Sequence, residues 1–139
     1  MGSFSSFDIS ASGISAQRTR MDVIANNVAN ADSTHTPEGG PYRRQVVTFR
    51  AVYEDAMGNR PIPGGVKVDG ITEDPTDFRT VLDPGNPDAD ENGYVKMPNV
   101  NVVEEMVDMI SATRAYEANV TALNATKSMI ATAIEIGKG

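Results

Sequence analysis

The chain of 139 residues has no cysteine, no tryptophan and one histidine, and only 6% of its residues are aromatic. Without cysteine it cannot form a disulfide, a thiolate nucleophile or a cysteine-ligated metal site. A hydrolytic triad needs a histidine beside a nucleophile, and the single candidate, His35, falls in an expected loop. One histidine does not make a metal site by itself. We therefore expect no catalytic residue, no metal and no cofactor, and a thin core.

Basic residues are scarce as well. The chain has 12 Lys and Arg against 19 Asp and Glu, and its net charge is −7. The segment from Asp69 to Glu91 carries this whole net charge, because it holds eight acids and a single base, Arg79. The only clustered bases are Arg43 and Arg44, too few for the basic footprint that a phosphate backbone requires. Nucleic acid is not an expected partner.

No segment approaches the roughly 20 consecutive apolar residues of a membrane-spanning helix. The first base is Arg18, so no basic region precedes an apolar run in the manner of a secretory signal. We expect no direct membrane insertion and no cleaved signal peptide. The protein then either stays in the cytosol or leaves by a route that reads no cleaved signal.

Proline is absent from residues 4–30, where glycine occurs once. Apolar and small residues recur there at steps of three and four, which predicts a helix. Ser5 and Asp8 fit an N-terminal capping box. The predicted apolar stripe, interrupted by Arg18, comprises Phe4, Phe7, Ala11, Ile14, Met21, Ala25 and Val28.

Residues 101–139 carry the longest periodic pattern and no proline. Steps of four and three continue for more than four heptads, predicting a helix of about 33 residues, roughly 50 Å long. Asn101 should cap it, with Glu104 at the third position, and Gly137 should end it. Thr113 and Lys127 interrupt the stripe, which comprises Val102, Met106, Met109, Tyr116, Val120, Leu123, Ile130 and Ile134. Val103, Val107 and Ile110 lie beside it as an apolar face that other chains could cover.

The middle of the chain, residues 31–100, holds all eight prolines and most of the glycines. Alternating apolar and polar residues predict short strands over Gln45–Tyr53, Val66–Ile71 and Phe78–Leu82. Gly64-Gly65 and Asn92-Gly93 should reverse the chain. We expect an α+β fold: helices 1–30 and 101–139 pair as an antiparallel coiled coil, and the small β-rich module 31–100 is looped out from their far end. A pair of this kind leaves apolar faces open and should associate with other chains.

The acidic segment contains part of a calcium-loop pattern in Asp88, Asp90, Asn92 and Gly93. The twelfth position, however, is Asn99 instead of the bidentate Glu, and prolines surround the loop. A polar hairpin with an Asn-Gly turn is the favoured interpretation.

Longer strings are more specific than the periodicity. Residues 25–31 (ANNVANA) and 36–44 (TPEGGPYRR) resemble the signature of flagellar rod and hook axial proteins. Residues 83–101 (DPGNPDADENGYVKMPNVN) and 111–129 (SATRAYEANVTALNATKSM) are similar to the proximal-rod proteins of the C type, and the resemblance runs from end to end. The residues that match the family motif are Asn26, Asn27, Asn30 and Tyr42. The spacer from Asp32 to Gly40 is longer than is usual in other rod and hook proteins.

The resemblance implies a non-enzymatic structural component of the flagellar basal-body rod, which spans the periplasm. Such a protein is exported through the flagellar type III apparatus without a cleaved signal peptide. It assembles helically with other rod proteins and copies of itself, its terminal helices form the axial core, and it transmits torque. The assembly interface is then expected on the bulky residues of the two helices: Phe4, Phe7, Ile14, Met21, Val28, Val102, Met106, Met109, Ile110, Tyr116, Val120, Leu123, Ile130 and Ile134. The alternative from another class is a non-enzymatic coiled-coil adaptor or cation-responsive binding module, whose helices complete their own core.

Overall fold

The computed structural model describes the backbone of residues 2–56 and 60–139, and the side chains of residues 5–54 and 62–139. The elements are α1 (Gly2–Ala29), β1 (Gln45–Ala56), β2 (Arg60–Glu73), β3 (Arg79–Leu82), β4 (Tyr94–Met97) and α2 (Val102–Lys138). The sheets are two antiparallel hairpins, β1–β2 and β3–β4. The expected α+β class is confirmed. Neither α1 nor α2, over the residues described, is long and apolar enough to cross a membrane.

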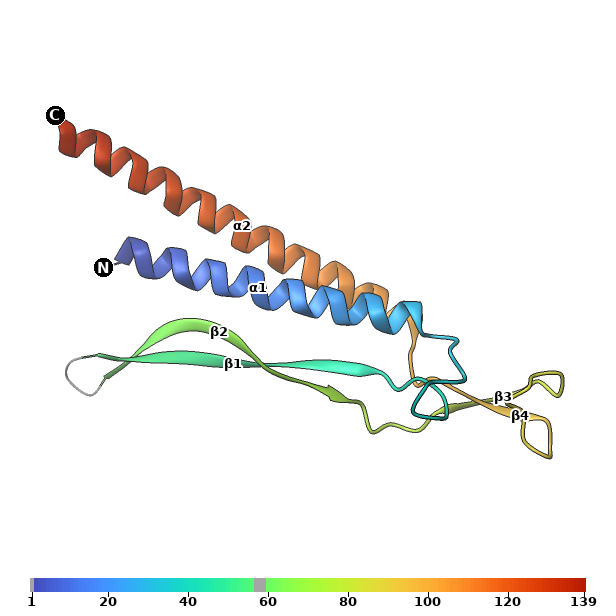
Figure 1. The fold of residues 1–139 in the computed structure, drawn as a ribbon. Helices are drawn as coiled ribbons and strands as arrows, with labels where there is room; N and C mark the ends of the chain where they lie inside the picture. The colour runs from blue at the N-terminus through green and yellow to red at the C-terminus, as the bar shows by residue number, and fades with distance from the viewer. Residues whose placement is uncertain (1, 57–59) are drawn as a thin grey trace.

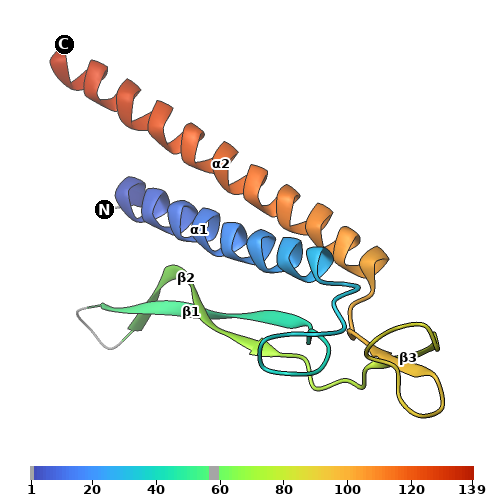
Figure 2. The same ribbon diagram turned by 45° about the vertical axis from the view of Figure 1, so that its right-hand side comes forward.

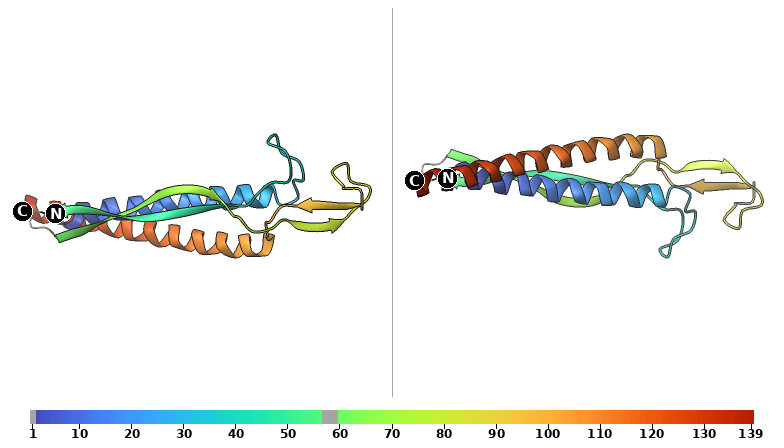
Figure 3. Two further views of the ribbon diagram at one scale, coloured as in Figure 1. Left: turned by 90° about the horizontal axis from the view of Figure 1, so that it is seen from below. Right: turned by 90° about the horizontal axis from the view of Figure 1, so that it is seen from above.

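The molecule is elongated and layered, with α1 between α2 and the β1–β2 hairpin (Figures 1 and 2). The two helices run antiparallel, and the β3–β4 hairpin extends beyond their junction (Figure 3). The sequence predicted a β module looped out from the end of the helix pair. This prediction describes β3–β4 but is wrong for β1–β2. The long hairpin folds back along α1, where the Val66 amide donates to the Ser12 hydroxyl at 3.1 Å. Small residues on this side of α1 let a strand approach closely.

Two helix ends differ from the predicted ones, the start of α1 and the end of α2. α1 begins at Gly2, so Ser5 and Asp8 lie inside the helix and the predicted capping box is wrong. The predicted cap of α2 is confirmed, because the Asn101 side chain accepts from the Val103 amide at 3.1 Å. Gly137 does not end α2, which spans 37 residues and is capped by Gly139.

Gly64 and Gly65 do not reverse the chain, which corrects the prediction. They lie inside β2, where Val52 pairs with Gly65 and Tyr53 with Pro63, leaving Gly64 as the extra residue of a bulge. Gly65 has a φ of +112°, and a Cβ built on it would lie 2.3 Å from the Ser12 Oγ. Glycine is required here for the approach of β2 to α1.

The turn at Asn92-Gly93 is confirmed, with φ of +83° at Gly93 and its amide donating to the Asp90 carbonyl at 3.0 Å. It leads into β4, a strand that the alternation pattern missed. The strand predicted over Phe78–Leu82 is present as β3.

The interface between the helices has a constant register. Asn27 contacts Glu105, and a Cβ at Gly13 would lie 2.8 Å from the Asn119 amide group, so two contacts recur 14 residues apart on each helix. On α2 one line of buried and half-buried residues follows steps of four and three: Glu105, Met109, Ala112, Tyr116, Asn119, Leu123, Thr126 and Ile130. Asp108, Thr113, Ala115 and Val120 are half-buried beside this line. Half of the predicted stripe therefore faces α1, namely Met109, Tyr116, Leu123 and Ile130. The other positions of this line lie one residue before the predicted ones: Glu105, Ala112, Asn119 and Thr126 replace Met106, Thr113, Val120 and Lys127.

On α1 the buried face precedes the predicted stripe by one residue. Its buried residues are small or polar as often as apolar: Ser10, Gly13, Ala16, Val23, Ile24 and Asn27. Ile14, Met21 and Val28 are half-buried, and Phe7 is exposed. Small side chains at Ser10, Gly13 and Ala16 allow the helix backbones to approach one another along this part of α1.

Replacement of Gly13 by leucine should separate the helices, because the new side chain would occupy the space of Asn119. We expect a loss of about 1–3 kcal/mol in the free energy of unfolding, measured by urea denaturation. The double variant Gly13→Leu/Asn119→Ala should recover part of this loss. Gly137→Leu is the matched control, since nothing lies within 4 Å of a Cβ at Gly137. Equal effects at the two glycines would contradict the close approach at Gly13.

Candidate functional site

A buried polar junction joins the end of α1, the start of β1, the end of β2 and the start of α2. Its centre consists of Asn27 and Glu105, each only 1% exposed. These elements meet near the point where the chain leaves the helix pair for the β3–β4 hairpin (Figure 1).

Asn27 uses its amide group fully. Its Nδ2 donates to the Gln45 carbonyl at 2.8 Å and to Glu105 Oε2 at 3.1 Å. Its Oδ1 accepts from the Tyr42 hydroxyl at 2.8 Å and from the Gln45 amide at 2.9 Å. A side chain with two donors and two accepted bonds has no unsatisfied group when buried. Asn27 thereby ties the end of α1 to the first residue of β1 and to α2.

The Glu105 carboxylate is held in the interior by Arg44. The Arg44 Nε donates to Glu105 Oε1, while one terminal nitrogen lies 3.0 Å from Asp74 Oδ2 and the other 3.6 Å from Asp108 Oδ2. Burial alone would lower the pKa of the Arg44 guanidinium, but the hydrogen bond and charge of Glu105, with those of Asp74, raise it above its usual value. A buried charge is tolerated only when it is paired and hydrogen-bonded, as this carboxylate is.

Asp74, at the edge of the junction, is also fixed in its charged form. The Thr76 amide donates to Asp74 Oδ1 at 2.9 Å, and this bond is the main reason that the pKa of Asp74 is lowered. The Thr76 side chain lowers it further, burial opposes the shift, and Arg44 adds to it.

Asn99 connects the junction to the segment before α2. Its Oδ1 accepts from the Arg44 amide at 2.7 Å, and its Nδ2 donates to the Asp74 carbonyl at 3.1 Å. Arg43 donates to the carbonyls of Asp74 and Thr76, both at 2.9 Å, so the segments around residues 43, 75 and 99 are held together.

The four motif residues lie together around this junction. Asn26 Nδ2 donates to the Tyr42 hydroxyl at 3.1 Å, and Asn30 Nδ2 donates to the Asn26 carbonyl at 2.9 Å. Burial raises the pKa of the Tyr42 hydroxyl; the Asn26 bond works against the shift, and the charges of Glu105 and Glu73 support it.

Sequence reasoning missed four members of the junction: Arg44, Asp74, Asn99 and Glu105. The available signal was Glu105 itself, an acidic residue three and four positions from apolar residues in the longest helical pattern. A charged residue at such a position is usually assigned to the solvent face, which hides its role.

The predicted assembly residues do not form one site but extend along both helices. Met106, Ile110 and Ile134 are 58%, 57% and 55% exposed, whereas Val120 is half-buried. Phe4 lies outside the residues whose side chains are described. Asp88 and Asp90, from the calcium-loop pattern, accept bonds from the Thr34 hydroxyl and from the amides of Asn92 and Tyr94. Among the described residues no three acidic or histidine side chains are grouped to hold a metal ion.

Comparison with known families places both helices in one class of protein. A family model described as "Flagella basal body rod protein" matches residues 7–35, and one described as "Flagellar basal body rod FlgEFG protein C-terminal" matches residues 91–136. The chain is thus of the flagellar rod class.

Full-length relatives define the type within this class. The chain is 49% identical to the flagellar basal-body rod protein FlgC of Bacillus subtilis, with 99% of the chain and 100% of the relative covered. It is 46% identical to FlgC of Borreliella burgdorferi, with both chains covered fully, and 48% identical to FlgC of Salmonella typhimurium, with 95% and 96% covered. The chain belongs to the FlgC family of flagellar basal-body rod proteins. It is a structural component of the rod, assembles with other rod components and is not an enzyme.

Replacement of Asn27 by alanine should strongly destabilise the fold, because Glu105, Tyr42 and both backbone groups of Gln45 lose a partner at once. We expect a loss of about 2–4 kcal/mol in the free energy of unfolding by urea denaturation. Asn26→Ala, at an exposed neighbouring position, is the matched control and should cost less than about 1 kcal/mol. Equal losses would contradict the central place of Asn27.

The lowered pKa of Asp74 makes stability depend on acid pH. Because the unfolded chain binds this proton more tightly than the folded chain, the contribution is complete above the ordinary value of 3.8 and is lost as the pH falls through the lower folded value. The free energy of unfolding should therefore fall between pH 5 and pH 2. Asp74→Asn should be less stable at pH 7 and show a shallower acid slope. Parallel slopes for both proteins would contradict this assignment.

Proposed function

We propose that the chain assembles helically with other rod proteins and with copies of itself in the proximal part of the rod, and that it transmits torque as part of the drive shaft. The observation that carries the proposal is an inverted distribution of side chains. The fully buried positions of the helix pair are mostly small or polar, while several bulky apolar residues, among them Val103, Met106 and Ile110, are more than half exposed. Neighbouring subunits supply the surface that buries them.

The outer face of α2 supports this proposal most directly. Val103, Met106, Val107 and Ile110 are 70%, 58%, 60% and 57% exposed and occupy little more than two turns of helix. Adjacent exposed apolar side chains on one face mark an interaction surface. The next residues along the same face are polar, as at Arg114, Glu117 and Thr121, so this patch ends there, and a second group of exposed apolar residues, Met129, Ile134 and Ile136, lies near the other end of α2.

The thin core is a second support. Over the described residues the buried apolar side chains are few: Ala16, Val23, Ile24, Ala31, Val95, Val100 and Ala112. A core of this size contributes little hydrophobic stabilisation, and contacts with other subunits would supply the rest. A thin core also lowers the free energy required to unfold the chain.

From the buried and exposed faces of the two helices we infer how the chain is divided into an axial core and an outer part. Residues 1–30 and 101–139 form the axial core, and residues 31–100 lie further from the axis. The steps of four and three along the inner face of α2 favour a coiled coil for the helix pair. We also propose that the protein is exported through the flagellar type III apparatus without a cleaved signal peptide, and that the rod containing it spans the periplasm. Family membership and the low cost of unfolding support this route.

A charged outer face should prevent assembly without unfolding the protein. In Met106→Lys/Ile110→Lys both positions are exposed, so the free energy of unfolding should change by less than about 1 kcal/mol. Burying lysines between subunits is unfavourable, so a strain with this variant as its only copy should lack rods in electron micrographs of isolated basal bodies.

The matched control is Ala118→Lys/Thr121→Lys, which places two charges on exposed positions of the same helix beyond the apolar patch. It should permit rods. Normal rods in the Met106→Lys/Ile110→Lys strain would overturn the assignment of this face, and loss of rods in both strains would show that it is not confined to residues 103–110.

A further inference from the structure

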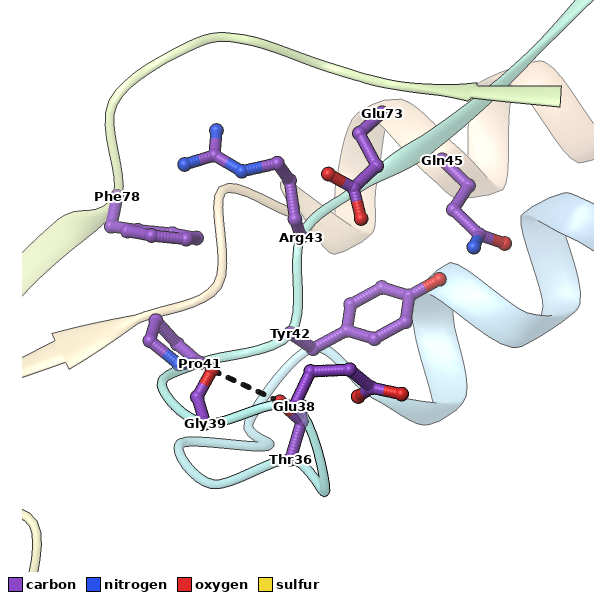
Figure 4. Close-up of a pocket in the computed structure, with 9 residues that line it drawn as sticks. All are labelled: Thr36, Glu38, Gly39, Pro41, Tyr42, Arg43, Gln45, Glu73 and Phe78. Carbon is purple, nitrogen blue, oxygen red and sulfur yellow. Dashed lines mark hydrogen bonds between the residues drawn. The ribbon is translucent and has the colours of Figure 1, made fainter.

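A pocket of about 430 Å³ lies beside the buried junction and shares Tyr42, Arg43 and Gln45 with its network. Its walls come from the loop after α1, from the first residues of β1, from the end of β2 and from the segment before β3 (Figure 4). The lining residues that matter for recognition are Glu38, Pro41, Tyr42, Glu73 and Phe78.

Two glutamates of this pocket have no cationic partner within the described chain. Glu38 and Glu73 are exposed, and neither forms an ion pair with another described residue. In the view of Figure 4 their carboxylates lie on either side of the Tyr42 ring. Glu73 is close enough to raise the pKa of the Tyr42 hydroxyl, although burial and Glu105 act on it as well.

The base that lines the pocket is already engaged elsewhere. Arg43 lies 4.2 Å above the centre of the Phe78 ring and donates to the carbonyls of Asp74 and Thr76. The Arg43 guanidinium therefore lies at the Phe78 side of the pocket, and Figure 4 shows it over that ring. The Tyr42 ring is fixed in turn, because its hydroxyl is bonded to Asn26 and Asn27.

We propose that this pocket binds a lysine or arginine side chain of a neighbouring rod subunit. A cation is attracted to the face of an aromatic ring, and carboxylates on both sides of that ring add charge complementarity. The aliphatic part of the side chain would lie against Pro41 and the ring. This inference rests on the proposed assembly and adds to it the chemistry of one contact.

The position of the pocket separates recognition from folding. One wall consists of residues 36–41, largely from the spacer between the asparagine-rich end of α1 and Tyr42. The junction is formed by Tyr42, Asn27 and Glu105, and the two glutamates of the pocket make no hydrogen bond to them. Changes in the spacer can therefore alter which subunit is accepted while the fold is preserved.

The test compares Glu38→Gln/Glu73→Gln with the wild type, each supplied as the only copy to a strain that lacks its own. Both positions are exposed, so the purified variant should melt with the wild type. We expect the number of isolated basal bodies with complete rods to fall about tenfold, in keeping with the loss of two charged contacts and a weakened cation–π contact. Glu91→Gln/Asp83→Asn removes the same charge from the loop between β3 and β4 and should leave rod numbers unchanged.

A second measurement identifies the occupant. A photoreactive amino acid in place of Glu38 should cross-link to a lysine- or arginine-containing stretch of a rod subunit, and mass spectrometry distinguishes a copy of this chain from another rod protein. Normal rod numbers in the glutamine variant, an equal loss in the control variant, or a cross-link to a stretch without a base would overturn the pocket proposal. Absence of the wild-type chain from rods would instead overturn the proposed function.

Discussion

The buried carboxylate of Glu105 is the constraint on which the rest of the structure depends. An unpaired charge in this position would cost several kcal/mol, so the fold must bring a donor to each oxygen. Asn27 reaches one oxygen from α1, and Arg44 reaches the other from the segment that leads into β1. Satisfying one side chain thereby sets the register of the helix pair and the start of the long hairpin. The same arginine contacts Asp74, which fixes where β2 ends.

This register explains why bulky residues such as Met106 and Ile110 lie outside the helix pair. With Asn27 opposite Glu105, the periodicity of both helices brings Gly13 opposite Asn119, and Ala16 and Ala112 are buried between these two contacts. Rotation of α2 by one residue would bring Met106 and Val120 into the places of Glu105 and Asn119 but would leave the Glu105 carboxylate without Asn27. The polar junction is therefore stabilised at the expense of hydrophobic burial within the monomer, and that burial remains to be gained in an assembly.

The helices and the Asn101 cap, which depend on residues close in sequence, could be predicted from the sequence. The face that each helix buries could not. The periodicity indicated both helices, and Asn101 was identified as a cap because a cap needs only its own neighbours. The buried face of α1 was misplaced by one position, because an apolar scale ranks Ile14 above Gly13. On α2 every second position was misplaced for the same reason, as with Met106 in the place of Glu105. Gly64-Gly65 has the composition of a turn, and only the proximity of Ser12 on α1 makes it a bulge. The motif residues were found by resemblance, whereas their shared partner Glu105 lies 78 residues from Asn27.

A shaft subunit has to resist sliding as well as separation, and the two kinds of contact in this protein divide that work. Apolar contacts are roughly proportional to buried area and have little directionality, so they hold subunits together but oppose lateral displacement weakly. Hydrogen bonds weaken steeply with angle, and a satisfied buried network is rigid for that reason. Here the network lies where the helices, the long hairpin and the distal β3–β4 segment meet. A force applied to the two hairpins would reach the helices through Asn27, Arg44 and Glu105, which are bonded to one another. Tyr42 extends this rigidity to the surface, since its hydroxyl is held in the junction and its ring lines the pocket.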